Sequence, residues 1–320
     1  MLAPLPLAHV MGLSTALVCL CTGARLLHRA RFDATETLDL LERGAASIFV
    51  GVPTMYADLE AAGADRRDLR AVHAWVSAAD AMPPDRARRF QAHGSALTAL
   101  GRPVGAAAFV DVYGMVELSG AAAVRLYPPS PGGPLPLASP AFTLPGIETR
   151  VVDPDGRPVA MGRPGELQFR GERVLRHYRG NPDAGPDADG WFSTGDFGRV
   201  GPGGLLVFSG RHKDRLKVGG FSVFPAEVEA ALEAHPDVAE VCVVGVADDR
   251  MGELPAALVV SRVRDFDLEA FAAFAAAQVA GYRRPRFVRL VDGLPRGGNG
   301  KIDRGAATTL MAELLADRSI

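Results

Sequence analysis

The sequence predicts an α/β protein: a large domain of helix-covered sheets with a β-barrel-like part, followed by a small α+β domain. Strand-like and helix-like segments alternate over residues 1–127, which favours a sheet covered by helices. Residues 128–210 are β-rich with frequent Gly and Pro, and residues 211–320 mix both kinds of segment. With 320 residues, 48% of them hydrophobic, the chain can bury a sizeable core. We expect two domains, at 1–210 and 211–320.

The elements of the first part follow from local signals. Residues 11–23 (MGLSTALVCLCTG) are apolar, but no Lys or Arg precedes them as in a signal peptide, and a membrane span needs about 20 apolar residues. We therefore expect a buried helix, no membrane span and a cytoplasmic protein. Pro53 ends a β-rich run, and Pro83 opens a basic helix. The expected helices are 35–43, 54–61 and 83–93, and the expected strands are 47–52 and 72–77.

A stretch rich in Pro, Gly and Ser at 128–144 marks a loop or subdomain boundary. Beyond it, short apolar runs between Gly-rich and Pro-rich turns predict antiparallel strands. After residue 210 the pattern becomes that of a compact α+β unit of ordinary small-domain size. The expected strands are 148–153, 165–170, 205–209, 238–246, 256–261 and 287–291, and the expected helices are 225–234 and 268–279.

Charge and cysteine content exclude several classes of function. The net charge is −2 with acids and bases interspersed, so no basic stripe indicates a nucleic-acid partner. Cys19, Cys21 and Cys242 are too few and wrongly spaced for a disulfide framework or a zinc site. We expect them to be buried thiols in a reducing compartment.

Three strings in the last third of the chain carry isolated charges among glycines: GWFSTGD at 190–196, GRHKDRLKVGGFSVFPAEVE at 210–229 and PRGGNGKIDR at 295–304. In their order and spacing they resemble the adenylate-forming superfamily, which includes the acyl-CoA synthetases. The resemblance implies that a carboxylic acid is activated with ATP as an acyl-adenylate and passed to CoA. ATP, Mg²⁺ and CoA are the cofactors and co-substrates that it implies.

Asp196 is the first candidate binding residue. A short carboxylate in the TGD turn is suited to accept hydrogen bonds from both ribose hydroxyls, and the resemblance gives it that role with Arg211 assisting. The structural alternative is an Asx-turn that stabilises a strand connection. GRHKD begins fourteen positions after Asp196, as it does in the family.

Lys301 is the main catalytic candidate. It follows GGNG, so a flexible loop can bring its ammonium group into a distant cleft. The alternative is a solvated lysine in a hairpin. The resemblance assigns it the catalytic role of bridging the carboxylate and α-phosphate oxygens, where positive charge stabilises the transition state.

The segment DVYGMVELSG at 111–120 resembles the family's YGxTE signature. The resemblance implies that the ring of Tyr113 covers the adenine and that Glu117 holds magnesium and takes part in catalysis. Val116 replaces the threonine of the signature, and it cannot donate a hydrogen bond to phosphate. The structural alternative is an aromatic residue packed before a helix with a surface glutamate.

Weaker signals lie beside the predicted adenine site. SAADAM at 77–82 resembles the small-residue loop that flanks the adenine, which places Ala78 there, and Asp111 occupies the position that contacts the adenine amino group in relatives. At the other end of the chain, PLPLAHVMG and GVPT resemble strings that border the acyl pocket, which places His9 and Gly51 there. A histidine on an apolar segment is more often a core residue.

The domain after residue 210 is predicted to rotate between an adenylating and a thioester-forming orientation. Lys213 occupies the family's hinge position, and a hinge is a few residues that absorb a dihedral change. The resemblance implies that Gly219, Gly220 and Phe221 line the CoA pantetheine tunnel after rotation. The alternative for the two glycines is a turn before a strand.

The chain lacks one part of the family's machinery. Relatives carry a further N-terminal part with a Ser/Thr/Gly-rich loop that wraps the phosphates. The expected partners are therefore the carboxylic acid, ATP and CoA, together with a missing N-terminal half or a second copy of the chain. The leading hypothesis is an acyl-CoA synthetase for a fatty acid. The alternatives are a malonyl-type CoA ligase and a non-catalytic fragment that binds a nucleotide or a partner.

Overall fold

The computed structural model describes residues 1–80, 82–129, 141–181, 185–297 and 301–316. The chain divides into two compact units. The first comprises residues 1–194 and 198–208, and the second comprises residues 195–197 and 209–320. A large sheet unit followed by a smaller α+β unit confirms the predicted fold class.

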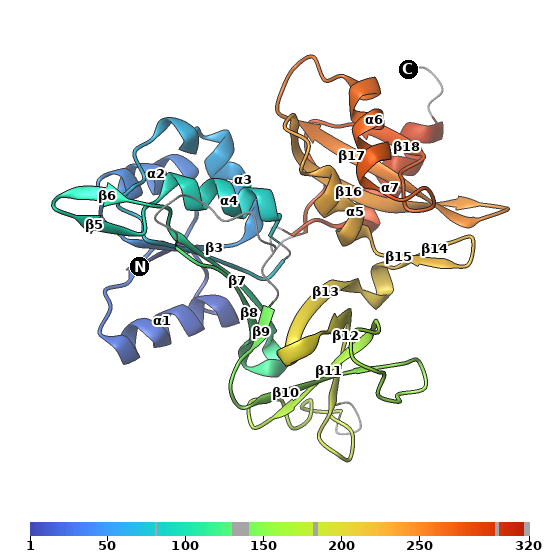
Figure 1. Ribbon diagram of the computed structural model, residues 1–320, viewed down its shortest axis with the longest axis horizontal. Coiled ribbons are helices and arrows are strands. Elements are labelled where there is room, and N and C mark those ends of the chain that lie inside the picture. Colours follow the sequence, from blue (N-terminus) through green and yellow to red (C-terminus); the bar gives the residue numbers. More distant parts are fainter. Residues whose placement is uncertain (81, 130–140, 182–184, 298–300, 317–320) are drawn as a thin grey trace. The chain divides into compact units, whose positions relative to one another are not determined.

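One large sheet organises the first unit (Figure 1). Its eleven strands have the order β10-β11-β12-β13-β9-β8-β7-β4-β3-β1-β2. The strands from β2 to β7 pair in parallel, whereas β7 to β9, β9 to β13 and β10 to β11 pair antiparallel. The strands are β1 (Leu2–Ala3), β2 (Leu27–His28), β3 (Ile48–Gly51), β4 (Ala74–Ala78), β7 (Ala108–Met115), β8 (Gly120–Tyr127), β9 (Ala141–Thr143), β10 (Ile147–Val152), β11 (Gly165–Gly171), β12 (Phe192–Val200) and β13 (Leu205–Arg211).

Helices cover the two faces of the parallel strands unequally. Figure 1 shows α2 (Ala34–Glu42), α3 (Pro53–Ala61) and α4 (Pro84–His93) on one face and α1 (Val10–Thr22) on the other. Because side chains alternate along a strand, Trp75 packs in the core under α2 to α4, and Val76 packs on the α1 side. A small hairpin of β5 (Leu97–Ala99) and β6 (Arg102–Val104) and the 3₁₀ turns η1 (Ala64–Arg66), η2 (Val116–Leu118) and η3 (Pro202–Gly204) complete the unit.

The helix starts have visible local causes. Asp33 accepts a hydrogen bond from the amide of Glu36 and caps α2. Pro53 and Pro84 occupy the first positions of α3 and α4, where a missing N–H costs nothing. These helices begin within one residue of their predicted starts, because capping signals are local in the sequence.

A five-stranded sheet forms the centre of the second unit. Its strands are β14 (Leu216–Val218), β15 (Phe221–Val223), β16 (Val238–Asp248), β17 (Gly252–Ser261) and β18 (Phe287–Leu290), in the order β15-β14-β17-β16 with β18 parallel to β17. Val241 and Val243 face a core with α5 (Pro225–Leu232) and α6 (Leu268–Gln278). Cys242 and Val244 face a second core with α7 (Arg304–Ala316). The turn η4 (His212–Asp214) precedes β14.

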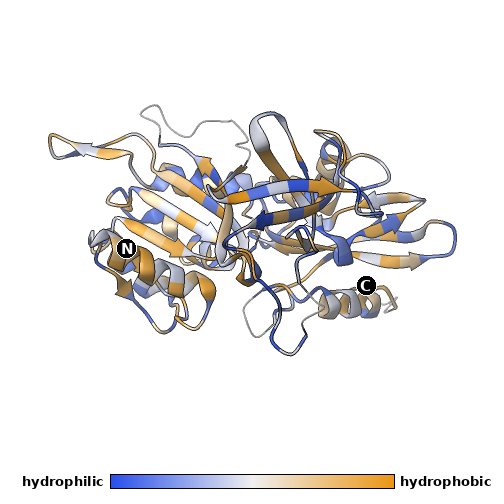
Figure 2. Cartoon of the chain, turned by 90° about the horizontal axis from the view of Figure 1, so that it is seen from below, coloured by the Kyte–Doolittle hydropathy of each residue, from blue (hydrophilic) through white to orange (hydrophobic). Residues whose placement is uncertain are grey.

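Helix α1 corrects the prediction of a buried helix. Leu13, Leu17 and Leu20 are 51%, 50% and 78% exposed, and they lie on one stripe of the helix. Only Gly12, Thr15 and Cys19 are buried, and much of α1 is coloured as hydrophobic in Figure 2. The apolar composition correctly predicts the helix, but it cannot tell which apolar face has a partner.

Two smaller predictions also need correction. Cys21 is exposed rather than buried, because it lies on the outer side of α1, while Cys19 and Cys242 are buried. Asp196 lies within β12 rather than in a turn, although the preceding Gly195 has a φ of 71°. Glycine tolerates that conformation, so the strand accommodates an irregularity that the sequence presents as a turn.

Trp75 is predicted to be a main source of stability in the first unit. It is fully buried, and its ring centroid lies 5.0 Å from that of Phe90 and 6.1 Å from that of Phe49. Trp75→Ala leaves a cavity, so we expect the free energy of unfolding to fall by about 3–5 kcal/mol. Urea unfolding measures this, with Leu20→Ala as a control that changes it by about 0.5 kcal/mol or less. Equal midpoints for both variants would contradict the packing described.

Candidate functional site

Two neighbouring parallel strands bring together the residues predicted to flank an adenine. Strand β4 ends at Ala78 and pairs with β7, where Ser77 lies opposite Asp111 and Ala78 opposite Val112. In α/β sheets, ligands bind outside the carboxyl ends of the strands. Ala78 and Asp111 are therefore neighbours in this sheet, and their place beside an adenine stays a prediction.

Asp111 has an unusual protonation equilibrium. Its side chain is 12% exposed and lies 3.7 Å from the guanidinium of Arg125. Burial raises the pKa of Asp111 to about 7, Arg125 acts against this, and Asp80 adds to it. A carboxyl group with this pKa changes its charge near neutral pH, which is typical of functional sites but also occurs in structural ones.

The ring of Tyr113 lies among aromatic side chains of the first unit. Its centroid is 5.8 Å from that of Phe169 in a stacked geometry and 5.7 Å from that of Phe208. Its position at the end of β7 is produced by a register shift between Tyr113 and Gly114. Gly114 is required there, because an added Cβ would lie 1.9 Å from the carbonyl oxygen of Gly120.

Glu117 follows β7 in the turn η2, and a residue that sequence reasoning missed contacts it. The hydroxyl of Tyr178 donates a hydrogen bond of 3.1 Å to Oε1 of Glu117. Sixty-one positions separate the two residues, so no local signal reveals the pair. The neighbouring Val116 is 68% exposed, and its side chain offers no hydrogen bond to a ligand.

The fit of Glu117 to a magnesium ion can be judged from its chemistry. Mg²⁺ prefers oxygen ligands and is often held by one or two carboxylates together with substrate phosphates. Glu117 supplies one such carboxylate and is partly exposed. Within the described residues, no group of three or more His, Cys, Asp and Glu side chains could hold a metal without the substrate. The residues present therefore fit a phosphate-bound ion.

In the second unit, Asp196 and Arg211 form the predicted pair. Oδ1 of Asp196 lies 3.3 Å from Nε of Arg211, and the two side chains are 3% and 51% exposed. A buried carboxylate is stable only if it is paired, and here the paired cation also reaches solvent. The adjacent Phe197 ring stacks on His212 at 5.3 Å, which joins β12 to η4.

Lys301 lies on one arm of a hairpin. Arg296 and Ile302 form an antiparallel bridge, and the amide of Gly297 donates to the carbonyl of Lys301 at 2.9 Å. The remaining residues of the GGNG string lie outside the described residues. Lys301 is partly buried, and its role stays a prediction.

The predicted hinge and CoA loop lie on either side of β14. Lys213 is exposed in η4. Gly219 and Gly220 have φ values of 55° and 85° and form the turn between β14 and β15. A Cβ at Gly219 would meet the side chain of Met251 at 2.5 Å. Phe221 is 58% exposed, and its ring centroid lies 4.8 Å from that of Tyr282.

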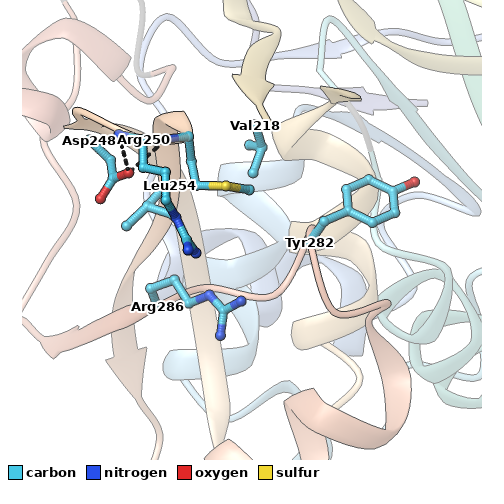
Figure 3. Close-up of a pocket in the computed structure, with 7 residues that line it drawn as sticks. Val218, Asp248, Arg250, Leu254, Tyr282 and Arg286 are labelled. Carbon is cyan, nitrogen blue, oxygen red and sulfur yellow. Dashed lines mark hydrogen bonds between the residues drawn. The ribbon is translucent and has the colours of Figure 1, made fainter. Parts of the chain in front are cut away.

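A cavity of about 380 Å³ opens beside this loop, and sequence reasoning missed it (Figure 3). Figure 3 shows the guanidinium groups of Arg250 and Arg286 extending into the same space, with Tyr282 at its side. The carboxylate of Asp248 accepts hydrogen bonds from the amides of Arg250 and Met251 and fixes this turn. The full lining is Val218, Asp248, Arg250, Met251, Leu254, Tyr282 and Arg286.

The two residues predicted for the acyl pocket differ in exposure. His9 is exposed and precedes α1, without capping it through its side chain. Gly51 is buried at the end of β3, where an added Cβ would lie 2.7 Å from the ring of Phe49. His9 is therefore not a core histidine.

These features define a class of protein before any comparison: a two-unit α/β protein with a buried acidic group paired to arginine and a lysine hairpin in the second unit. The family model described as AMP-binding enzyme matches residues 1–179, and that described as AMP-binding enzyme C-terminal domain matches residues 227–301. The chain belongs to the AMP-binding enzyme family. None of the helices within the described residues is long and apolar enough to cross a bilayer.

Relatives of known name support this assignment. The chain is 32% identical to 4-coumarate–CoA ligase 5 of Oryza sativa subsp. japonica, over 95% of this chain and 56% of that protein. It is 34% identical to feruloyl-CoA synthase of Amycolatopsis sp., over 94% of this chain and 59% of that protein. The chain thus spans little more than half the length of these relatives.

Solved structures give the same result. The anthranilate CoA ligase AuaEII in complex with anthranoyl-AMP matches with a TM-score of 0.81 and 26% identity, over 98% of this chain and 60% of that chain. ATP-bound MatB from Rhodopseudomonas palustris matches with a TM-score of 0.78 and 28% identity, over 98% and 60%. The amide bond synthetase McbA from Marinactinospora thermotolerans matches with a TM-score of 0.79 and 26% identity, over 97% and 61%.

The raised pKa of Asp111 predicts a pH-dependent stability. The folded state keeps this proton up to about pH 7, whereas an unfolded aspartate loses it near pH 4. The stabilisation is therefore fully present below about pH 4 and is lost as the pH rises to about 7. At most about 4 kcal/mol is involved, from three pKa units at about 1.4 kcal/mol each.

Asp111→Asn mimics the protonated form, so we expect it to remove this slope and to be more stable than the wild type at pH 8. Urea unfolding at intervals from pH 4 to pH 8 measures the difference between the two proteins. Parallel stability curves over this interval would contradict the burial of an ionisable Asp111.

Proposed function

We propose that this chain is the larger part of an AMP-forming acid–CoA ligase, which activates a carboxylic acid as an acyl-adenylate and transfers the acyl group to CoA. A carboxylate is a poor electrophile, and joining it to AMP creates a leaving group that a thiol can displace. The observation that carries the proposal is the buried carboxylate of Asp196 paired with Arg211 at 3.3 Å, in a protein whose second unit also presents the Lys301 hairpin. The family assignment supports the same chemistry.

In this proposal the two units supply different parts of the adenylation site. Ala78, Asp111 and Tyr113 contact the adenine, and Asp196 with Arg211 holds the ribose. Glu117 is the protein ligand of a magnesium ion that neutralises phosphate charge when bound. The ammonium of Lys301 stabilises the negative charge that develops where the carboxylate oxygen meets the α-phosphorus.

In this proposal the second half-reaction, thioester formation, uses residues of the second unit other than Lys301. We assign to Lys213 the hinge, and to Gly219, Gly220 and Phe221 the pantetheine channel. The cavity that holds Arg250 and Arg286 lies beside this loop. It suits the phosphates of CoA, because one guanidinium group can donate two parallel hydrogen bonds to phosphate oxygens. McbA is described as an amide bond synthetase, so CoA transfer needs its own assay.

The substrate remains a prediction at the level of class. Fatty acids are the acids predicted from the sequence, but several of the relatives bear the names of aromatic acids: coumarate, ferulate, anthranilate and indoleacetate. We propose an apolar or aromatic monocarboxylic acid. His9 and Gly51 border its pocket in this proposal, and neither supplies a fixed cation for a second carboxylate, as a malonyl-type substrate would require.

The alternative function is a nucleotide-binding or partner-binding protein without catalysis. Two observations favour it: Val116 is 68% exposed where the family signature has threonine, and the chain spans 56% and 59% of two CoA-ligase relatives. Such a protein would bind AMP through Asp196 and release no pyrophosphate.

The experiment that tests the function is pyrophosphate release by the protein with ATP, Mg²⁺, CoA and a panel of aromatic and fatty acids. By analogy with the loss of one oxyanion donor, we expect Lys301→Ala to lower the rate by about 10²–10³-fold. Arg157→Ala is a control that removes one positive charge from a side chain 78% exposed, and it should leave the rate unchanged.

AMP binding separates the alternatives. Pyrophosphate release that depends on Lys301 supports the ligase. AMP binding that Asp196→Ala abolishes, without pyrophosphate release, supports the non-catalytic protein. Absence of both activities in the folded protein would overturn the proposed function.

The exposed apolar stripe of α1 suggests where a partner of this chain binds. We propose that Leu13, Leu17 and Leu20 form an interface that is covered in the active protein by a segment that the relatives carry outside the matched region. A contiguous exposed apolar surface is typical of an interaction site. A second copy of this chain is the other possible occupant.

The triple variant Leu13→Gln, Leu17→Gln and Leu20→Gln tests this interface. Because these side chains are at least half exposed, we expect the free energy of unfolding to change little and self-association, measured by light scattering, to decrease. A loss of more than about 3 kcal/mol, as in a core substitution, would show that the chain itself buries the stripe. A discrete wild-type dimer that the variant converts to a monomer would show that a second copy is the occupant.

A further inference from the structure

Arginines fix both arms of the hairpin that carries Lys301. On the first arm, Arg296 contacts Glu240 of β16 at 2.6 Å. On the second arm, Arg304 forms a two-point contact with Glu229 of α5, with distances of 2.6 Å and 2.7 Å. Two-point arginine–carboxylate contacts restrict both distance and orientation. The base of the hairpin is thus held in one register against the second unit's sheet.

The environment of Arg304 extends beyond this pair. Its guanidinium donates a hydrogen bond to the carbonyl of Val243 at 3.0 Å, and its Nε lies 3.6 Å from the carboxylate of Asp214. Glu229 in turn accepts a hydrogen bond from the amide of Val243 at 2.7 Å. Burial opposes the charge, yet Glu229 raises the pKa of Arg304 above its ordinary value, so the group stays charged.

Asp214 connects this cluster to the predicted hinge, which an ion pair that only stabilised the fold would not need to do. It ends the turn η4, directly after the predicted hinge residue Lys213. Arg304 begins α7, three residues after Lys301. The residue that directly follows the hairpin of the catalytic candidate therefore contacts, through its guanidinium, the segment that enters the second unit.

We propose that Arg304 is a positioning residue that couples the Lys301 hairpin to the hinge segment through Asp214. The role in catalysis rests on the proposed function, but the coupling itself does not. Movement of the hinge segment then displaces the hairpin with it, and the ammonium of Lys301 keeps a fixed relation to η4. A lysine at position 304 cannot make these contacts, because it lacks the planar fork of donors.

Hydrogen exchange of the intact chain tests the coupling without any need for turnover. The amides of Gly297 and Asp303, which donate across the hairpin, report on its opening. We expect Asp214→Asn to speed their exchange about two- to fivefold, the range for a partly exposed ion pair. Arg304→Lys should speed it about tenfold or more and should also speed exchange at residues 212–218.

Two further variants separate coupling from a general loss of stability. Arg296→Ala should speed exchange in the hairpin but not at residues 212–218, because its partner Glu240 lies away from η4 on β16. Arg283→Ala removes a contact of 3.1 Å with Glu227 on α5 and should change neither segment. If Asp214→Asn leaves Gly297 and Asp303 unchanged, or if all four variants speed exchange equally throughout the unit, the coupling is overturned.

The half-reactions then test the catalytic consequence. We expect Asp214→Asn to lower acyl-adenylate formation more than thioester formation from supplied acyl-AMP and CoA, since only the first step needs Lys301 in the cleft. Equal loss in both steps contradicts the positioning role. If the wild type performs neither step while the exchange pattern holds, the proposed function fails and the coupling stands.

Discussion

A buried carboxylate has to be paired, and this constraint shapes the second unit. Asp196 is 3% exposed and pairs with Arg211, and Glu229, 12% exposed, pairs with Arg304. In each pair the arginine is more exposed than its partner, with values of 51% and 27%. Removing a charged group from water is costly unless its partner is close and well oriented. Each pair therefore fixes two segments that are distant in the sequence, and each arginine retains access to solvent or to other ligands.

The sequence predicts well what depends on neighbouring residues. The helices α2, α3 and α4 begin at Asp33-capped or proline-marked positions, and the strands of the second unit follow the alternation that separates Val243 from Val244. Positions such as Asp196, Arg211 and Lys301 can be proposed as site residues because their motifs are contiguous. Partners that lie far apart in the sequence cannot be predicted in this way. Tyr178 is 61 residues from Glu117, and residues from separate elements line the cavity of Arg250 and Arg286. These relations arise from topology, for which a short motif carries no signal.

Helix α1 shows a second limit of prediction from the sequence. Its composition indicates burial, and burial is the usual state of an apolar helix. Yet Leu20 is 78% exposed. An apolar stripe indicates that burial against a partner is favourable, but it does not indicate which segment provides that partner. The chain spans little more than half of its relatives, and the proposed partner of the stripe is a segment that the relatives carry outside the matched region. The protein's sheet, with helices α2 to α4 on one face and α1 on the other (Figure 1), is consistent with this interpretation.

The distribution of the candidate residues explains why a hinge matters to this chemistry. Asp111, Tyr113 and Glu117 belong to the first unit, whereas Lys301 and the CoA loop belong to the second. A nucleotide held by one unit can meet two different surfaces of the other only if the connecting segment changes its dihedral angles. The connection near Ser209 is short, and η4 follows it directly. Asp214 of η4 contacts Arg304 at the start of α7, three residues after Lys301. The proposed alternation between adenylation and thioester formation needs such a link between the predicted hinge and Lys301.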